Sequence, residues 1–233
     1  MRPHALFITP FTDVLYGLDG CLTRGFRSLA MVFVGMLAGW WIYVPIHELL
    51  HASGCLAAGG QVSRLEIATP YGGTLFARIF PFVVAGSQHA GRLSGFDTGG
   101  SDWTYLATDL APFVLTLFPG VWLLRHAAGA RSPLAFGAAL PFALAPFLSL
   151  TGDAYEIGAV AVTRLPPWSR WSALLRGDDL LRRVTDLAQS PGVTAGTWTG
   201  LVLSALLGVV WAFLTWWAAD AVARLLGQGP VRR

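Results

Sequence analysis

The sequence predicts an all-α polytopic membrane protein with about four transmembrane helices and a short membrane-associated β-hairpin after the first helix. Its 233 residues are 54% hydrophobic and only 12% charged, whereas about 25% of the residues in a typical soluble domain are charged. The mean hydropathy is +0.56. Residues 29–46 form a run of eighteen residues without a formal charge, and a helix needs roughly 17 to 25 apolar residues to cross a bilayer. These observations predict an integral membrane protein.

The apolar runs divide the chain into a short leading segment and one membrane domain. Residues 1–28 carry charges amid modestly apolar sequence, and they predict an interfacial N-terminal arm rather than a signal peptide. Residues 29–233 leave no room for a second folded unit beside several spans, so they predict a single integral membrane domain. Its predicted spans are residues 29–58, 103–124, 133–163 and 198–219.

The segment after the first span has a different pattern. Residues 61–67 alternate between apolar and polar side chains, and together with residues 69–76 they predict two short strands around a turn. Residues 79–86 are apolar but too few to cross a membrane as a helix, and residues 91–102 read as a polar, glycine-rich loop. We therefore expect a re-entrant hairpin and loop over residues 61–90 that enters the membrane and returns.

The charged and aromatic residues indicate which partners to expect. The net charge of +3 includes sixteen arginines and no lysine. These arginines flank the apolar runs, and most of the ten tryptophans lie near the ends of those runs, as is typical of side chains that anchor at lipid headgroups. A basic stripe with interleaved aromatic residues is missing from the sequence. We therefore expect the lipid bilayer of the cell membrane (plasma or inner) as a partner and no nucleic acid; the oligomeric state is not predicted.

Residues 47–51 read His-Glu-Leu-Leu-His, an HExxH sequence at the end of the first apolar run. Residues i and i+4 of a helix share a face, so His47 and His51 can bind one Zn²⁺ while Glu48 stays beside the open coordination position. HExxH also arises by chance in proteins without a metal. Here, however, an ionisable residue inside a membrane helix costs at least ~2.5 to 3.5 kcal/mol, and a segment that only had to span would not carry three. The sequence therefore predicts a zinc site with Glu48 as the catalytic base.

A catalytic zinc site generally has a third protein ligand. Depth in the membrane separates the candidates, because Asp153 follows nineteen uncharged residues counted from Leu134. Asp153 and His47 should therefore lie at a similar depth, about 27 to 29 Å along their helices. This match favours Asp153 and requires the first and third spans to run parallel. The other candidates were weighed too: His89 as an interfacial side chain, Asp109 as a hydrogen-bonding group of the bundle, and Glu156 as a group that orients a ligand or pairs with an arginine.

Several ordered segments around these candidates match the motifs of one known family. They are residues 47–51 (HELLH), 60–67 (GQVSRLEI), 70–73 (PYGG), 110–112 (LAP) and 152–154 (GDA). They resemble the HExxH motif, the G-x-V-x-x-I/L-x-I and P-F-G-G stretch, the A-G-P segment and the L-D-G motif of the site-2 protease family of intramembrane zinc metalloproteases. The resemblance covers about residues 40–156.

The resemblance implies a divergent zinc-dependent metalloendopeptidase that cleaves transmembrane or membrane-associated protein substrates. Asp153 matches the aspartate of the L-D-G motif, which is the third zinc ligand in the family. The chain departs from the family at Leu115, where the family has an asparagine that lines the active site, and at Ala154, where it has a glycine. Asp109 is a candidate to replace that asparagine.

A second class of protein fits some of the same residues. A metal-ion transporter, or a catalytically silent scaffold, would be a non-proteolytic membrane protein that uses the same metal site. Transporters tend to place ionisable residues along a continuous pathway, whereas here they concentrate at one depth. A silent relative would have no need of Glu48. These two differences favour the protease.

Overall fold

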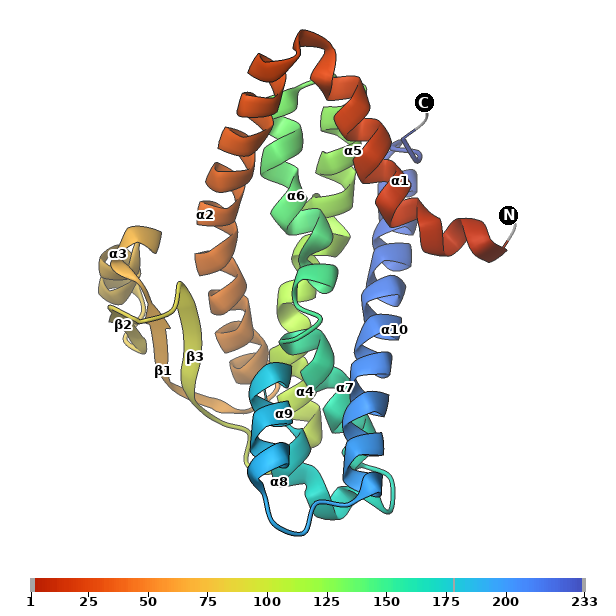
Figure 1. Ribbon diagram of the computed structural model, residues 1–233. Helices are drawn as coiled ribbons and strands as arrows, with labels where there is room; N and C mark the ends of the chain where they lie inside the picture. The colour runs from red at the N-terminus through yellow and green to blue at the C-terminus, as the bar shows by residue number, and fades with distance from the viewer. Residues whose placement is uncertain (1–2, 178, 232–233) are drawn as a thin grey trace.

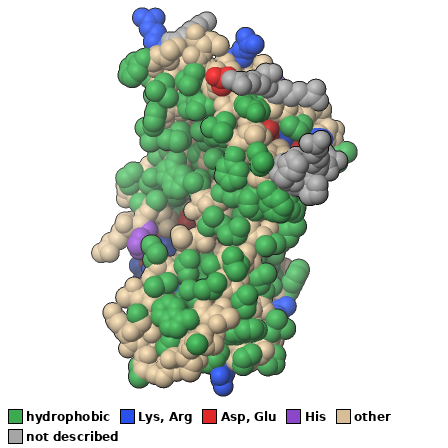
Figure 2. Space-filling model, turned by 45° about the vertical axis from the view of Figure 1, so that its right-hand side comes forward, with side chains coloured by type: hydrophobic (Ala, Val, Ile, Leu, Met, Phe, Trp, Pro, Cys, Tyr) green, Lys and Arg blue, Asp and Glu red, His purple; other side chains and the backbone are tan. Residues whose placement is uncertain are grey.

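Long apolar helices stand side by side and form most of the molecule (Figure 1). The computed structural model describes residues 3–177 and 179–231. Among these residues, four helical segments are long and apolar enough to cross a membrane: Phe26–Ala57, Asp102–Gly129, Pro133–Thr163 and Ala195–Leu225. Hydrophobic side chains dominate the face drawn in Figure 2. The helical architecture and the number and approximate places of the four long segments agree with the sequence-based prediction.

The helices and strands follow one another with short connections. The helices are α1 (Pro3–Cys21), α2 (Phe26–Ala57), α3 (Gly73–Ile79), α4 (Asp102–Leu110), α5 (Val121–Gly129), α6 (Pro133–Leu148), α7 (Asp153–Thr163), α8 (Ser172–Leu175), α9 (Leu180–Gln189) and α10 (Ala195–Leu225), and the strands are β1 (Gln61–Ile67), β2 (Val83–Ala85) and β3 (Gly91–Asp97). The second long segment therefore consists of α4 and α5, and the third consists of α6 and α7. The sequence predicted each as one continuous span.

Prolines interrupt the second long segment and lie near the break in the third. Pro112 and Pro119 lie in the irregular stretch between α4 and α5. Pro146 lies near the end of α6, and because it has no N–H it leaves the carbonyl of Phe142 without its usual helical partner. The hydroxyl of Thr116 donates a hydrogen bond of 2.8 Å to that carbonyl. This contact stabilises an irregular backbone inside the bundle, where an unpaired carbonyl would cost energy.

The strands form one sheet in the order β2-β1-β3. Strand β1 is parallel to β2 and antiparallel to β3, with Leu65 opposite Leu93 and Gln61 opposite Asp97. The predicted hairpin is therefore right in its first strand and wrong in its second. The antiparallel partner of β1 is β3, a segment that was expected to be a loop.

Local chemistry explains why the second predicted strand does not form. Residues 69–71 make a single 3₁₀ turn with Pro70 at its start, and Gly72 adopts a left-handed conformation with φ of 81°. The chain then enters α3 instead of returning along β1. Strand β3 contains Gly91 and Gly95, and glycine weakens a strand pattern, so its sequence alone did not indicate a strand.

The sheet lies against α2 (Figure 1). Leu65, Ile67 and Val83 are buried and pack in one cluster with Ala52 of α2. Farther along, the indole nitrogen of Trp41 donates a hydrogen bond to the carbonyl of Pro70, which brings the turn after β1 to the middle of α2. This arrangement is compatible with the predicted re-entrant segment, whose entry into the membrane remains a prediction.

Helix α1 is fastened to the bundle by a buried ionic network. Asp13 is 0% exposed and Arg125 is 2% exposed, and Nη2 of Arg125 lies 2.7 Å from Asp13 and 2.5 Å from Asp220. The backbone N–H of Val231 donates to the other oxygen of Asp13 at 2.9 Å. These contacts join the middle of α1 to the C-terminal segment, and both described ends of the chain lie on the same side of the bundle (Figure 1). The interfacial position predicted for residues 1–28 is not tested by these contacts.

We expect Asp13→Ala to lower the free energy of unfolding by about 3 to 5 kcal/mol, because it removes one partner of a buried ion pair. The matched control is Arg224→Ala, since Arg224 contacts Asp220 from a more exposed position, with 39% of its side chain accessible. The control should lose no more than about 1 kcal/mol. Denaturant titration in detergent, followed by circular dichroism, measures both values. Equal small losses would mean that this network does not hold α1.

Candidate metal centre

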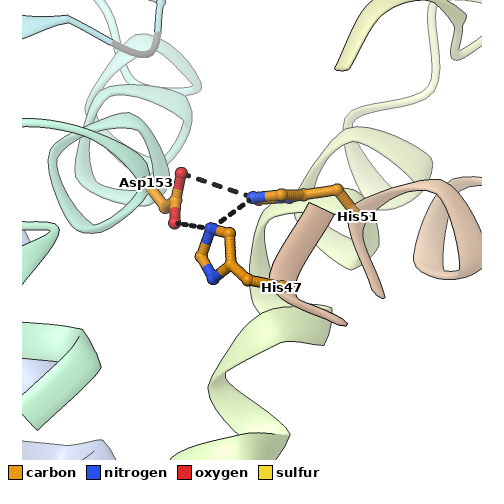
Figure 3. Close-up of side chains that lie close together, drawn as sticks. All are labelled: His47, His51 and Asp153. Atoms are coloured by element: carbon orange, nitrogen blue, oxygen red, sulfur yellow. Dashed lines mark hydrogen bonds and ion pairs between the residues drawn. The ribbon is translucent and has the colours of Figure 1, made fainter. Parts of the chain in front are cut away.

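Three potential metal ligands converge where α2 meets the start of α7 (Figure 3). Nε2 of His47 lies 3.1 Å from Nε2 of His51 and 3.3 Å from Oδ2 of Asp153. Nε2 of His51 lies 3.5 Å from Oδ1 of the same carboxylate. Among the described residues, these three form the one group of His, Cys, Asp or Glu side chains close enough together to hold a metal ion.

The separations between these atoms fit a tetrahedral ion. Zinc binds histidine nitrogen and carboxylate oxygen at about 2.0 to 2.2 Å, so two ligand atoms of a tetrahedral site lie about 3.3 to 3.5 Å apart. The two imidazole nitrogens lie 3.1 Å apart, and each lies near a different oxygen of Asp153, at 3.3 Å for His47 and 3.5 Å for His51, all close to that value. The set of two imidazoles and one carboxylate leaves a fourth position open, as catalytic zinc sites do.

In each imidazole, the second ring nitrogen, Nδ1, also has a hydrogen-bond partner. Nδ1 of His51 lies 2.8 Å from the backbone carbonyl of Thr108, and since a carbonyl only accepts, Nδ1 carries the proton. Nε2 of His51 is then left with a lone pair for a metal. Nδ1 of His47 lies 2.7 Å from the hydroxyl of Tyr43. Such outer contacts orient histidine ligands in metal sites.

Close packing of α2 on α6 sets the register between the histidines and Asp153. A Cβ atom placed on Gly35 would lie 2.1 Å from the carbonyl oxygen of Leu134, and one placed on Gly39 would lie 2.3 Å from that of Ala138. Both contacts advance by four residues in the same direction, so the helices run parallel. The prediction that Asp153 and His47 lie at a similar depth required the first and third long segments to be parallel, as they are.

The break between α6 and α7 brings Asp153 to the histidines. Residues 149–152 form a turn in which the N–H of Gly152 donates to the carbonyl of Ser149 at 2.9 Å. The N–H of Leu180, at the start of α9, donates to the carbonyl of Thr151 at 2.8 Å. Asp153 is the first residue of α7. The turn therefore fixes the direction in which its carboxylate points.

Glu48 lies beside the three residues and lines the same cavity of about 260 Å³. A Cβ atom placed on Gly91 would lie 2.4 Å from Cγ of Glu48 and 3.0 Å from its Cδ. The absence of a side chain at position 91 therefore makes room for the glutamate. Strand β3 forms this wall of the cavity, with Gly91 against the side chain of Glu48.

A side-chain contact fastens β3 to β1. The hydroxyl of Ser94 donates to Oε1 of Glu66 at 3.0 Å, and Nε of Arg64 donates to the same oxygen at 2.9 Å. The Ser94 hydrogen bond, together with Arg64, lowers the pKa of Glu66 below its ordinary value. A carboxyl whose pKa is lower in the folded state stabilises the fold above its unfolded pKa, and loses that contribution as the pH falls through the lowered value. The contact is therefore present at neutral pH.

The other candidate residues occupy different places. Asp109 and Glu156 are buried and line the same cavity, and the hydroxyl of Tyr105 donates to Oε1 of Glu156. His89 is exposed and lines a neighbouring cavity instead. Leu115 packs in an apolar cluster with Tyr43 and does not line the cavity. Asp109 and Glu156 are thus the residues of this group that line the cavity with the three potential ligands.

Sequence reasoning missed three contributors to this site. Tyr43 could have been found, because it precedes His47 by four residues and so shares its helix face. Thr108 contributes its backbone carbonyl, which leaves no trace in the sequence. Gly91 contributes by having no side chain, in a segment that was expected to be a loop.

The fold and the site together define a helical bundle with a His₂Asp group at the wall of a cavity. Comparisons of the chain with models of known protein families, with curated proteins and with solved structures found no match. The resemblance to the site-2 protease family therefore rests on the sequence motifs alone.

We expect the purified protein to bind one zinc ion per chain, measured by elemental analysis, and to lose it in His47→Ala, His51→Ala and Asp153→Ala, because each removes one of three ligands. The control is His89→Ala, which removes an exposed histidine outside the cluster and should keep zinc. Full occupancy and unchanged affinity in Asp153→Ala would show that the third ligand is a different residue.

Proposed function

We propose that this protein is an intramembrane zinc metalloprotease, a multi-pass protein of the plasma or inner membrane that hydrolyses peptide bonds of membrane-embedded substrates. The observation that carries the proposal is the triangle of donor atoms from His47, His51 and Asp153 beside Glu48. These four residues lie in helices long and apolar enough to span a membrane. Placing carboxylates and imidazoles in a membrane-spanning helix costs free energy, so their presence in such helices indicates a function.

The residues have distinct roles in the proposed reaction. His47, His51 and Asp153 would hold Zn²⁺, which would supply a Lewis acid for the scissile carbonyl and would lower the pKa of a water molecule at the site. Glu48 takes the proton from that water as general base and then delivers it to the leaving amine as general acid. Thr108 and Tyr43 hold the two imidazoles in the orientation that ligation needs.

A transmembrane substrate must present an extended backbone, because the peptide bonds of a helix in a membrane are shielded by its own hydrogen bonds. A free strand edge near the metal ligands could pair with such an extended backbone. Strand β1 lies between β2 and β3, whereas β3 is an edge strand and lines the cavity beside Glu48. We therefore propose β3 as the strand that pairs with the unwound substrate.

We expect Glu48→Gln to keep zinc and folding but to lose peptidase activity, because glutamine preserves the shape and removes the base. The measurement compares cleavage of candidate single-span proteins, co-expressed with the wild type or with the variant. Zinc content of the purified variant is the control for an intact site. Turnover within about tenfold of wild type would favour a metal-ion transporter or a silent scaffold, since general-base catalysis typically contributes about 10² to 10⁴-fold.

We also expect Gly91→Ala to lower activity about 100-fold while zinc is retained, because the new methyl group would displace Glu48 and small misplacements of a catalytic group have effects of this size. The matched control is Gly129→Ala, where an added Cβ meets nothing within 4 Å. Cleavage rate and zinc content are measured for both variants. Wild-type activity in Gly91→Ala would mean that β3 does not position Glu48.

A further inference from the structure

Two cavities meet at the proposed catalytic residue. The cavity already described, of about 260 Å³, is lined by His47, Glu48 and Gly91. A second cavity of about 220 Å³ shares these three lining residues. An extended chain that crosses Glu48 would therefore place its neighbouring side chains in different cavities, because successive residues project to opposite faces.

The second cavity, which we call the apolar cavity, is walled mainly by hydrophobic side chains. Trp40, Tyr43 and Val44 come from α2, and Ala145 and Leu148 come from α6. The hydroxyl of the tyrosine is engaged with the imidazole of His47, so its ring is what remains to line the wall. The chemistry of this cavity favours an aliphatic or aromatic side chain, whose burial removes apolar surface from water.

The first cavity, which we call the polar cavity, is lined by hydrogen-bonding groups. Tyr105, Thr108 and Asp109 come from α4, Glu156 comes from α7, and Ser94 comes from β3. Carboxylate oxygens accept hydrogen bonds. Glu48, Asp109 and Glu156 outnumber Arg92 among the charged groups of this lining, so these walls favour a polar side chain that donates hydrogen bonds over an acidic one.

The two cavities lie in order along the bundle. The α2 residues of the apolar cavity precede His47 and lie toward the middle of that helix, whereas His51 and the first turns of α4 lie toward the end where α4 begins (Figure 1). That end is charged, since Asp102 pairs with Arg164 at 3.0 Å and with Arg176 at 2.6 Å. The apolar cavity therefore faces the middle of the bundle and the polar cavity faces its charged end.

We propose that the cleft selects the boundary at which a transmembrane segment of the substrate passes from apolar to polar sequence. A bulky apolar residue occupies the apolar cavity on one side of the scissile bond, and a hydrogen-bond donor such as Ser, Thr, Asn or Gln occupies the polar cavity on the other side. This inference rests on the proposed protease function and names the substrate class for that site.

Leu148 provides the variant that tests the apolar cavity. Its side chain is 57% exposed and belongs to neither the proposed ligands nor the base, so Leu148→Trp can fill the cavity while zinc is retained. The matched control is Leu134→Trp, on the same helix at a position that is 45% exposed and lines neither cavity.

The experiment uses the full-length protein in liposomes with single-span test substrates whose apolar segment ends at different positions. Mass spectrometry identifies each cleavage site, and kcat/KM is measured for substrates with Leu or Ala on the apolar side and Gln or Glu on the polar side. We expect cleavage to follow the apolar-to-polar boundary and to be at least tenfold faster with Gln than with Glu. Leu148→Trp should lower the preference for Leu over Ala at least tenfold, whereas Leu134→Trp should leave it unchanged.

The outcomes separate this inference from the function on which it rests. Cleavage that depends on Glu48 but ignores the boundary, or a Leu148→Trp variant that slows Leu and Ala substrates equally, would overturn the inference and leave the protease intact. Wild-type protein that cleaves no more than Glu48→Gln would overturn both.

Discussion

The close contact between α2 and α6 is the constraint on which the candidate metal centre depends. Glycines at positions 35 and 39 of α2 let the backbones approach until a Cβ atom would overlap the carbonyls of Leu134 and Ala138. Helices packed this closely in apolar surroundings are held by van der Waals contact rather than by a hydrophobic driving force. Because the contact is parallel, α2 and α6 run toward the same end of the bundle, where the turn at residues 149–152 places Asp153 beside His47. A larger residue at either glycine would separate donor atoms that now lie 3.3 Å apart.

The second requirement of the site is an interruption of the helices, and hydrogen bonds from side chains compensate for the backbone hydrogen bonds that are lost there. The turn at residues 149–152 allows α7 to begin at Asp153. Pro146 leaves the carbonyl of Phe142 without its usual helical partner. Thr116, in the non-α stretch between α4 and α5, donates a hydrogen bond to that carbonyl. Carbonyls freed in this way must be paired inside a bundle. At Pro146, the hydroxyl of Thr116 supplies the donor that the freed carbonyl needs.

Features that repeat within a helix could be predicted from the sequence, and features that depend on distant partners could not. Spacing alone places His47 and His51 on one face, and counting uncharged residues pairs them with Asp153. Strand β3 escaped prediction because its order comes from pairing with β1 across an intervening helix, and its glycines hide the strand pattern. The burial of Asp13 escaped prediction because its partner, Arg125, lies more than a hundred residues away. That residues 69–79 do not form a strand could be predicted in part, because Pro70 and Gly72 favour a turn.

The start of α7 at Asp153 has an electrostatic consequence. The N-terminal end of a helix carries a partial positive charge of about half an elementary unit, which favours negative groups in the first turn by about 0.3 to 1 kcal/mol. Asp153 and Glu156 both lie in that first turn. Had the third span been one unbroken helix, Asp153 would sit in mid-helix, beyond the reach of this field. The break therefore does more than orient the carboxylate of Asp153, because the peptide dipoles of α7 also stabilise its negative charge beside His47 and His51.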